Sequence, residues 1–407
     1  MKFSKDDIYQ RAYRAYLDAR KNERNKDTQL NFEIGFEKGL YRIVNRLYSG
    51  SWKPAPPIRF AIEYPTMREV FAPMFQDRIV SHILFNELNP IVERSLIYDC
   101  YSCRKGKGTL FGIERFEHFL RSVTQDYTKE AFVLNVDISG YFMHINHGIL
   151  YSQIENLVER YRFREYKGRV WNDITDFDFL LDVARKVVFR NPLNGCITIG
   201  NLGLFDRIPL RKKMEGTAPD CGLIIGDLPS QLFSNLYLSD YDHYVKRVLK
   251  CGCYGRYVDD SFLMSTDKGY LTECKYAIAE YLSTNLGLNL NFAKTKIKST
   301  KRDLTFLGAD LRERRRYALS RTLRHFKNEA FALRDAVVAG ELLSMTDATD
   351  CLAVLNSYLG YLNHFRTYKA VKSIMDESQE LSSVFVFAKD YSFANIRKDF
   401  INNLKYN

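Results

Sequence analysis

The stretch CYGRYVDDSFLMS, residues 253–265, places two aspartates side by side between two short runs of strand-forming residues. Neighbouring side chains of an extended strand point to opposite faces, so Asp259 and Asp260 cannot share one site if the backbone stays extended. We therefore expect a hairpin turn here, with Asp259 directed into a cleft. Ionised carboxylates beside apolar strands are costly unless a partner binds them. The alternative is that both are ordinary turn residues, a common role for aspartate.

A second carboxylate follows another apolar run. The segment AFVLNVDIS, residues 131–139, is expected to form a buried strand that leads into Asp137. A hard divalent cation is rarely held by one carboxylate, so Asp137 and Asp259 are candidate ligands together with the backbone carbonyl of Ile138. Two carboxylates on adjacent strands can hold two Mg²⁺ ions, with Mn²⁺ as the alternative metal. Paired metals of this kind suit phosphoryl chemistry.

Composition points to a polyanionic partner. The 407 residues include 60 Lys and Arg against 49 Asp and Glu, which gives a formal net charge of +11. A basic balance favours nucleic acid, although many basic proteins never bind it. The 27 tyrosines and 28 phenylalanines can pack cores or stack on bases. The length predicts two or three subdomains.

The cysteines and the first residues favour a cytoplasmic protein. The opening MKFSKDDIYQ has no apolar signal region, and no run approaches the ~18 apolar residues of a membrane span. The eight cysteines are therefore expected to be reduced thiols.

Helical and strand patterns alternate unevenly along the chain. Apolar residues at helical spacing dominate residues 1–50, and helix is again expected from Ser320 onward. The centre mixes buried strands with helices, including one long helix over residues 228–249. Residues 191–221 have no clear period and are expected to form loops with a short hairpin. This order favours an α+β body followed by a helical C-terminal domain.

Seven segments in this order resemble the motifs of bacterial reverse transcriptases, over roughly residues 55–365. They are YPTMREVFAPMFQDRIVSH, YSCRKGKGT, LNVDISGYFMHI, GLIIGDLPSQLFSNLYL, GRYVDD, LGLNLNFAKTKI and LTFLGADL. Each motif alone is weak evidence, but all seven in the family's order are specific. The resemblance implies an RNA-directed DNA polymerase that makes cDNA by nucleotidyl transfer.

The resemblance also implies a right-hand polymerase fold. This is an α+β architecture whose fingers and palm contain an antiparallel sheet flanked by helices, followed by a helical thumb. The expected parts are an N-terminal helical extension (1–57), fingers (58–130), palm (131–315, with a helical insertion at about 148–221), and a thumb with the C-terminal region (316–407).

Catalytic roles transfer to matching positions. Asp137 and Asp259 match the family's metal-binding aspartates, and Asp260 matches the neighbour in the Y-x-D-D motif. Their implied role is to hold two Mg²⁺ ions against the deoxynucleoside triphosphate and the primer 3′-hydroxyl. Phe142 matches the aromatic residue that excludes a ribose 2′-hydroxyl; the alternative is that Phe142 only packs in the core.

Basic and polar side chains are implied to contact the substrates. The implied nucleotide contacts are Arg68, Arg78, Gln231 and Lys294, and the implied template and primer contacts are Arg104, Lys107, Phe306, Leu307 and Gly308. Arginine suits this role because its fork binds phosphate oxygens bidentately. Lys294 or Lys296 matches the lysine of the family's next motif, a candidate proton donor to pyrophosphate. The alternatives are a solvated basic face for the cations and a bracing role in the palm for Gln231.

One position departs from many relatives. Retroviral and intron-type relatives often carry Gln-Gly where this chain has Ile225-Gly226. Isoleucine cannot make the polar contacts of that glutamine. The Ile-Gly pair resembles diversity-generating retroelement enzymes and ungrouped bacterial relatives, so we hypothesise that Ile225, as part of the nucleotide site, loosens base discrimination.

Three biological settings compete. The fingers motifs most resemble defence-associated bacterial enzymes that block phage by cDNA synthesis. The alternative is a diversity-generating retroelement enzyme with error-prone synthesis, and the third is an inactive scaffold that only binds nucleic acid. The expected partners are an RNA template, such as a dedicated noncoding RNA, the DNA product, deoxynucleotides, and an accessory protein or second reverse transcriptase. Homo-oligomerisation stays open, and no membrane partner is expected.

Overall fold

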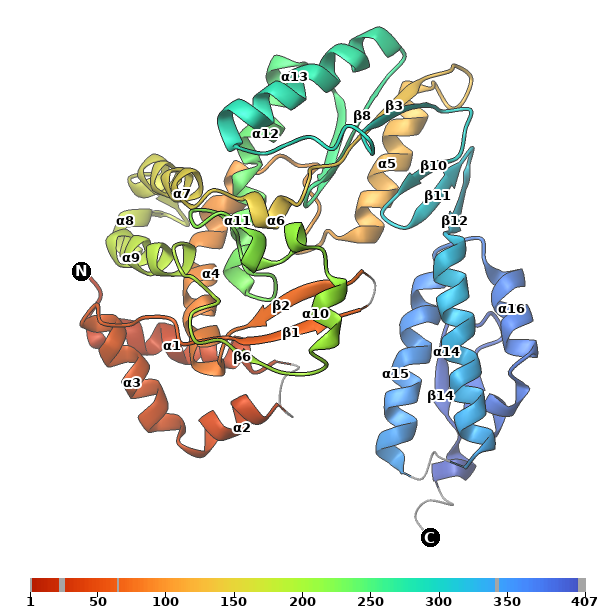
Figure 1. Ribbon diagram of the computed structural model, residues 1–407, viewed down its shortest axis with the longest axis horizontal. Coiled ribbons are helices and arrows are strands. Elements are labelled where there is room, and N and C mark those ends of the chain that lie inside the picture. The colour runs from red at the N-terminus through yellow and green to blue at the C-terminus, as the bar shows by residue number, and fades with distance from the viewer. Residues whose placement is uncertain (1, 22–25, 64–65, 341–343, 402–407) are drawn as a thin grey trace. The chain divides into compact units, whose positions relative to one another are not determined.

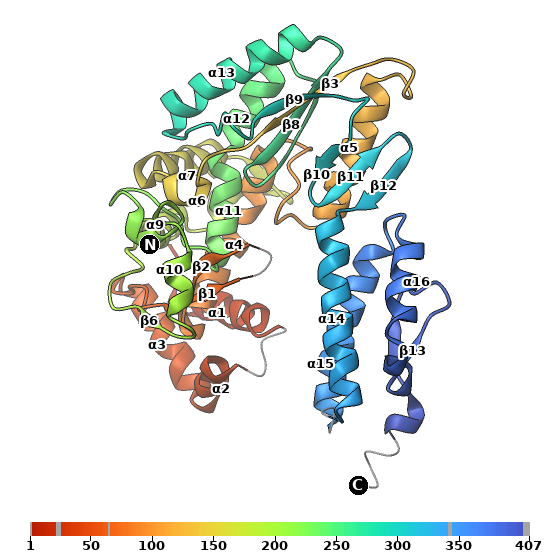
Figure 2. The ribbon, with the colours of Figure 1, turned by 45° about the vertical axis from the view of Figure 1, so that its right-hand side comes forward.

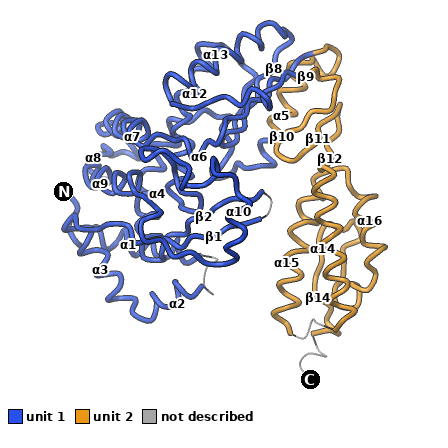
Figure 3. Tube along the Cα trace, viewed as in Figure 1, with its two compact units in different colours: residues 1–112, 131–297 blue, residues 113–130, 298–407 orange. Residues whose placement is uncertain are grey.

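The computed structural model describes residues 2–21, 26–63, 66–340 and 344–401. The chain divides into two compact units (Figure 3): unit 1 comprises residues 1–112 and 131–297, and unit 2 comprises residues 113–130 and 298–407. Helices and sheets mix in both, which confirms the α+β class. The division into fingers, palm and thumb stays a prediction.

Unit 1 is centred on a four-stranded sheet of order β7-β8-β3-β9. The strands are β3 (Phe132–Val136), β7 (Cys253–Tyr257), β8 (Asp260–Ser265) and β9 (Lys296–Ser299). β3 lies between β8 and β9, which explains the apolar run that predicted a buried strand. Helix α13 (Lys268–Leu286) packs against β3 and β8 (Figure 1). Asp267 caps its N-terminus, and Gly287 ends it at φ +62°.

Helix α4 (Phe75–Ser95) organises the helical part of unit 1. It contacts α1, α7, α9 and α11, and its residues Ile79, Ile83 and Leu84 are completely or almost completely buried (Figure 2). The bounds of the surrounding helices are α1 (Lys5–Ala19), α2 (Asp27–Ile34), α3 (Phe36–Tyr48), α7 (His147–Arg162), α8 (Trp171–Ile174), α9 (Phe177–Val188) and α11 (Leu228–Tyr237).

A smaller sheet has the order β2-β1-β6. Strands β1 (Ile58–Ile62) and β2 (Arg68–Ala72) pair antiparallel, and β6 (Ile197–Thr198) runs parallel to β1. The hairpin expected within residues 191–221 is therefore wrong. The amide of Ile197 donates to the carbonyl of Pro57, so this segment pairs with the free edge of β1 instead of with itself. The segment continues into α10 (Gly203–Arg207) and two 3₁₀ turns, Leu210–Lys212 and Met214–Gly216. A two-stranded hairpin occurs elsewhere, between β4 (Glu165–Tyr166) and β5 (Arg169–Val170).

The long helix expected over residues 228–249 is also wrong. It breaks after α11 into α12 (Ser239–His243) and a π-helical turn, Tyr244–Val248. The division at Leu238 is slight, because the amide of Asp242 still donates to the carbonyl of Leu238 at 2.9 Å. Helix α12 carries Asp242 into an ion pair with Arg256 of β7.

Unit 2 combines an antiparallel sheet with helices. The sheet is β10 (Leu304–Phe306), β11 (Ala309–Arg312) and β12 (Arg315–Ala318). Helix α5 (Thr109–Val123) begins in unit 1 and continues into unit 2, where Phe116 stacks on Phe306 with ring centres 5.2 Å apart. The remaining elements are α14 (Ser320–Val338), α15 (Met345–Leu362), α16 (Tyr368–Asp376), a 3₁₀ turn (Gln379–Ser383) and the paired strands β13 (Phe385–Phe387) and β14 (Ala394–Ile396). Among the described residues, no helix combines the length and the apolar character needed to cross a bilayer.

Candidate active site

Residues 253–265 form the predicted hairpin. Strands β7 and β8 pair as far as Tyr257 opposite Asp260, which leaves Val258 and Asp259 as the two-residue turn. Val258 has φ +56°, a costly conformation for a β-branched residue. Asp259 therefore sits on the turn itself, while Asp260 begins β8.

Asp137 lies beside this hairpin. Strand β3 pairs with β8 so that Val136 faces Ser261, and continuing this register by one residue places Asp137 opposite Asp260. The amide of Asp137 donates to the hydroxyl of the buried Thr295 at 3.2 Å. The structure thus brings the three predicted carboxylates to one edge of the sheet.

The backbone after Asp137 offers one further oxygen. Ile138 pairs with Leu290 through an isolated bridge, in which the carbonyl of Asp137 accepts from Asn291 and the amide of Ser139 donates to Asn289. The peptide groups of the bridged residue itself then point to the other side of the strand. This geometry leaves the carbonyl of Ile138 suitable as a ligand.

Negative charge is in excess at this edge. Burial, and then the charges of Asp260 and Asp137, raise the pKa of Asp259 to about 7, although the Arg256 guanidinium opposes the shift. Restricted hydration and the charge of Asp137 also raise the pKa of Asp260. The nearest cation to Asp137 is the exposed Lys294, whose Nζ lies 3.2 Å from Asp137 Oδ2.

This donor set fits a hard cation. Hard divalent cations prefer oxygen ligands. A bound cation also offsets the mutual repulsion of the carboxylates. Within the described residues, no group of three or more His, Cys, Asp or Glu side chains is arranged so that it could hold a metal ion by itself. A bound ion would therefore use Asp137, Asp259 and the Ile138 carbonyl, and would complete its coordination with substrate oxygens or water.

A buried ion pair that the sequence reasoning missed lies beneath the turn. Arg256 Nε and Nη2 each donate to Asp242 at 2.7 Å, and both side chains have no solvent exposure. The hydroxyl of Tyr254 donates to the same carboxylate at 2.6 Å. An arginine within the apolar run CYGRY was the available signal, because a buried charge requires a partner.

This ion pair fixes the Val258–Asp259 turn. Arg256 Nη1 donates to the carbonyl of Val258 at 2.8 Å, and the amide of Val258 donates to Ser102 Oγ at 3.1 Å. Ser102 Oγ in turn donates to Asn235 Oδ1 at 3.0 Å. Both polar backbone groups of the strained residue next to Asp259 are thus held by buried side chains.

The segment that supplies Ser102 pairs with the edge of β7. The amide of Tyr101 donates to the carbonyl of Arg256, and the amide of Arg256 donates to the carbonyl of Asp99, each at 2.9 Å. Gly255 allows this close approach, since a Cβ there would lie 2.2 Å from the Tyr101 hydroxyl oxygen. The YSCRKGKGT motif is thereby attached to the YVDD turn.

Residues 64–311, more than half of the chain, match the family described as reverse transcriptase (RNA-dependent DNA polymerase). The chain belongs to the reverse transcriptase family. It is accordingly an RNA-directed DNA polymerase, and the right-hand polymerase fold expected from the sequence is the fold of this family. Protein YkfC of Escherichia coli strain K12 is 24% identical over 331 residues, which are 73% of this chain and 77% of YkfC.

Solved telomerases are similar in structure. Apo telomerase from Candida tropicalis matches with a TM-score of 0.47 and 12% identity over 81% of this chain and 59% of that chain. Telomerase from Candida albicans, in complex with a TWJ fragment of telomeric RNA, matches with a TM-score of 0.45 and 12% identity over 82% of this chain and 58% of that chain. The reverse transcriptase thus spans less than two thirds of either telomerase chain.

Two predicted nucleotide contacts of the reverse transcriptase lie together. Phe142, in helix α6 (Tyr141–His144), and Ile225 both pack, partly buried, against a small apolar cluster that includes Phe71 and Met143. The carbonyl of Phe142 also accepts from the amide of Leu223 at 2.8 Å. The structure therefore brings the predicted sugar-contacting and base-contacting residues to one cluster.

Glycine is required beside Ile225. Gly226 has φ +116°, and a Cβ there would lie 2.8 Å from Val70 and 2.9 Å from the carbonyl oxygen of Phe71. The carbonyl of Ile225 accepts from the amide of Phe71 at 2.9 Å. The Ile225-Gly226 segment thus lies directly on β2, the strand that begins at Arg68. The guanidinium of Arg68 donates to the Thr66 hydroxyl.

The two cations predicted to contact the template, Arg104 and Lys107, make different contacts. Arg104 Nε donates to Glu93, and its Nη1 donates to the carbonyls of Ile97 and Cys100, each bond being 2.8–2.9 Å. Lys107 lies over the ring of Tyr98 and donates to the carbonyl of the same residue, and burial lowers its pKa. Arg104 therefore stiffens the loop, and template contact by either cation stays a prediction.

The remaining predicted residues are distributed over both units. Gln231 is exposed on α11, whereas Asn235, one turn later, is buried in the network of Ser102 and Arg256. Arg78 is half-buried on α4, and its charge favours ionisation of the buried Asp227, whose pKa burial raises. Phe306, Leu307 and Gly308 form the end of β10 and its turn in unit 2, with Leu307 and Gly308 at positive φ.

Proposed function

We propose that this reverse transcriptase synthesises cDNA from an RNA template and deoxynucleoside triphosphates at Asp137, Asp259 and Asp260, with two Mg²⁺ ions as cofactors. The observation that carries the proposal is the strand register, which sets Asp137 opposite Asp260 and puts Asp259 on the adjoining turn. The environment of Asp259 supports it, since burial and then the charges of Asp260 and Asp137 raise its pKa to about 7, and a bound cation would stabilise the ionised carboxylates.

In the proposed reaction, the primer 3′-hydroxyl loses its proton to water, its oxygen attacks the α-phosphorus, and the bond to pyrophosphate breaks. Asp137, Asp259 and the Ile138 carbonyl would hold the two ions, which would supply activation of the 3′-hydroxyl and charge neutralisation on the leaving group. Lys294 is positioned beside Asp137 and donates a proton to the departing pyrophosphate. Arg256 and Ser102 keep the Val258–Asp259 turn in one conformation.

The nucleotide is proposed to lie against the cluster shared by Phe142 and Ile225. Phe142 contacts the sugar and excludes a 2′-hydroxyl, which selects deoxynucleotides. Arg68 binds the triphosphate through its guanidinium fork. Ile225 presents an apolar side chain where a glutamine would offer hydrogen bonds, so base selection there depends on shape alone.

We infer a setting in bacterial antiphage defence, in the cytoplasm. The support is the resemblance of residues 68–82 and 98–109 to the defence-associated class. A dedicated noncoding RNA and an accessory protein or second reverse transcriptase are the proposed partners. Error-prone synthesis in a diversity-generating retroelement is the second candidate, favoured by Ile225-Gly226. The three carboxylates argue against an inactive scaffold.

The test is sequencing of nucleic acid that copurifies with the protein expressed from its own operon, beside an Asp259→Asn variant. We expect cDNA with the native protein only, and its sequence identifies the template, the priming site and the error rate. Phage-protection assays on the same pair of strains test the defence setting. Identical RNA and no cDNA in both preparations would contradict the proposal and support the scaffold.

A further inference from the structure

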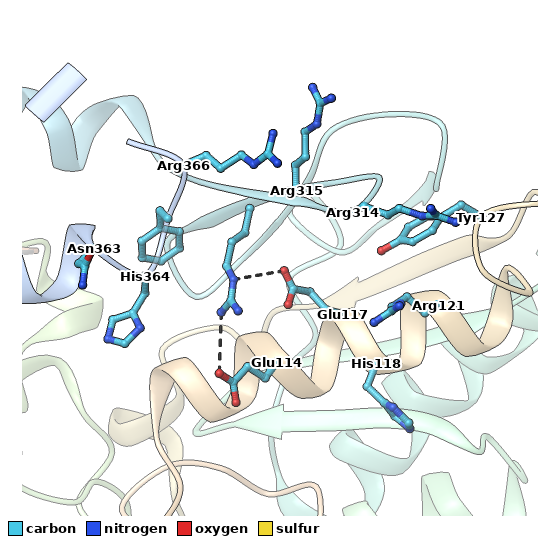
Figure 4. Close-up of a pocket in the computed structure, with 12 residues that line it drawn as sticks. Glu114, Glu117, His118, Arg121, Tyr127, Arg314, Arg315, Asn363, His364 and Arg366 are labelled. Carbon is cyan, nitrogen blue, oxygen red and sulfur yellow. Dashed lines mark ion pairs between the residues drawn. The ribbon is translucent and has the colours of Figure 1, made fainter. Parts of the chain in front are cut away.

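Unit 2 contains a cavity of about 600 Å³ that the proposed chemistry does not use (Figure 4). Its walls come from α5 and the following loop, from the β11–β12 turn, and from the loop between α15 and α16. Five arginines line it: Arg121, Arg314, Arg315, Arg316 and Arg366. We call it the arginine cavity. His118, His364 and the hydroxyl-bearing Tyr127 also line it.

Carboxylates neutralise only part of this charge. Arg316 lies 3.6 Å from Glu117 and 3.9 Å from Glu114, and these are the dashed pairs in Figure 4. Arg121 and Arg314 share Asp126. Three carboxylates thus serve three of the five arginines.

Arg315 and Arg366 have no ion-pair partner within the part of the chain that the structure describes. Both are exposed, and Figure 4 shows their side chains extending away from Glu114 and Glu117. The amide of Arg366 donates to the carbonyl of Arg316 at 2.9 Å, which fixes the α15–α16 loop beside β12. Two guanidinium forks are therefore held next to one cavity with their donors available.

The wall of the cavity is also strained. Gln125, Asp126 and Tyr127 have consecutive φ values of +50°, +58° and +71°, and Arg314 has φ +53°. Each such residue costs on the order of 1 kcal/mol, and such outliers concentrate at ligand sites. Burial raises the pKa of Tyr127, so its hydroxyl stays protonated and can donate a hydrogen bond.

We propose that the arginine cavity binds the polyphosphate of a nucleotide, either a free nucleoside triphosphate or the 5′-triphosphate end of an RNA. Arginine forks bind phosphate oxygens bidentately, and several charges in one cavity suit a polyphosphate better than a single backbone phosphate. The volume lies within the range of small-ligand sites. The assignment is independent of cDNA synthesis, since no residue of the cavity belongs to the carboxylate site.

The test measures binding of a short fluorescent RNA to the full chain by anisotropy, with a 5′-triphosphate or a 5′-hydroxyl. Chelator is present, so that metal-dependent nucleotide binding at the carboxylates does not contribute. The variants are Arg315→Ala/Arg366→Ala and the charge-retaining Arg315→Lys/Arg366→Lys. The matched control is Arg321→Ala/Arg324→Ala, which removes the same charge from exposed positions of α14 outside the cavity.

We expect the alanine cavity variant to bind 5′-triphosphate RNA at least about tenfold more weakly, the lysine variant to fall between, and the control to change about twofold or less. Competition by free GTP or tripolyphosphate identifies a free nucleotide as the source; lack of competition identifies the RNA end. Equal binding of both RNAs by the native protein, or equal weakening by the cavity and control variants, would overturn the proposal. Unaltered triphosphate binding by Asp259→Asn separates it from the proposed polymerase site.

Discussion

Unit 1 treats its aspartates in two opposite ways. Asp242 is completely buried, yet Arg256 and Tyr254 satisfy it with three hydrogen bonds of 2.6–2.7 Å. Asp259 and Asp260 lie near Asp137 with raised pKa values, and the closest cation to that group is a lysine exposed to solvent. Asp242 thus forms part of a satisfied buried core, whereas Asp137, Asp259 and Asp260 repel one another unless a cation binds to them.

Neutralising one aspartate of each kind should give the largest effects. Asp259→Asn should lower primer extension by about a thousandfold or more, because a metal ligand is lost, without lowering the free energy of unfolding. Asp242→Asn should lower the free energy of unfolding by about 3–5 kcal/mol, because Arg256 becomes an unpaired buried charge. Primer extension and urea unfolding measure both. Equal loss of stability in the two variants would contradict the distinction.

Removing the other partner of the buried pair separates stability from positioning. Arg256→Met should cost about 3–5 kcal/mol of unfolding free energy, because Asp242 is left buried and unpaired. The double variant Arg256→Met/Asp242→Leu should recover most of that stability. Its primer extension should stay low, since the carbonyl of Val258 has lost its donor. Full recovery of activity in the double variant would show that Arg256 acts only on folding.

Removing the hydrogen bond between Ser102 and Val258 should disturb the same turn with a smaller loss of stability. Ser102→Ala removes the acceptor of the Val258 amide and should cost about 1–2 kcal/mol of unfolding free energy. The maximal rate of primer extension should fall about tenfold, since a displaced catalytic group is costly even when the shift is small. Ser152→Ala, at an exposed position of α7, is the control. A rate equal to that of the control would remove Ser102 from the positioning network.

The raised pKa of Asp259, caused by burial and then by the neighbouring carboxylates, should appear in the pH dependence of stability without metal. The pKa of Asp259 rises from 3.8 in the unfolded chain to about 7 in the fold, so the folded state holds its proton more tightly. Its contribution to stability is therefore lost as the pH rises from about 4 to 7. In chelator, native protein should lose about 1–3 kcal/mol more than Asp259→Asn between pH 5 and pH 8. Parallel pH profiles would contradict a raised pKa of Asp259 in the folded protein.

The smallest effect is expected at Ile225. Ile225→Gln should lower misincorporation several-fold, because the amide adds a polar contact beside the base. Ile225→Leu keeps an apolar side chain of similar size and is the control. Sequencing of cDNA products counts the errors. An unchanged error rate in the glutamine variant would remove Ile225 from base selection.

The local features of the active site could be predicted from the sequence. Alternating strand geometry is short-range, so the turn at Asp259 and the strand before Asp137 follow from a few residues each. The seven ordered motifs supplied the family, and with it the fold class. Asp137 and Asp260 then become neighbours once their strands, β3 and β8, pair with each other.

The supporting contacts could not be predicted, because they join distant segments. Arg256 forms an ion pair with Asp242 of α12 and a hydrogen bond with Asn235 of α11. The edge of β7 pairs with the segment Asp99–Ser102, which lies about 150 residues earlier in the chain. The division of the segment 228–249 into α11, α12 and a π-helical turn has no signal in the local sequence pattern either. Within residues 191–221, Ile197 and Thr198 pair with the edge of β1, although the sequence of this segment has no strong strand pattern.

The discontinuity of unit 2 has a consequence during synthesis on the ribosome. Residues 113–130 emerge before residues 131–297, yet Phe116 finds its stacking partner, Phe306, only in the segment that follows. At translation speeds of about 5–20 residues per second, this apolar helix face waits roughly 10–40 s for its partner. The nascent chain therefore carries an apolar helix face without its final packing partner through nearly half of its synthesis.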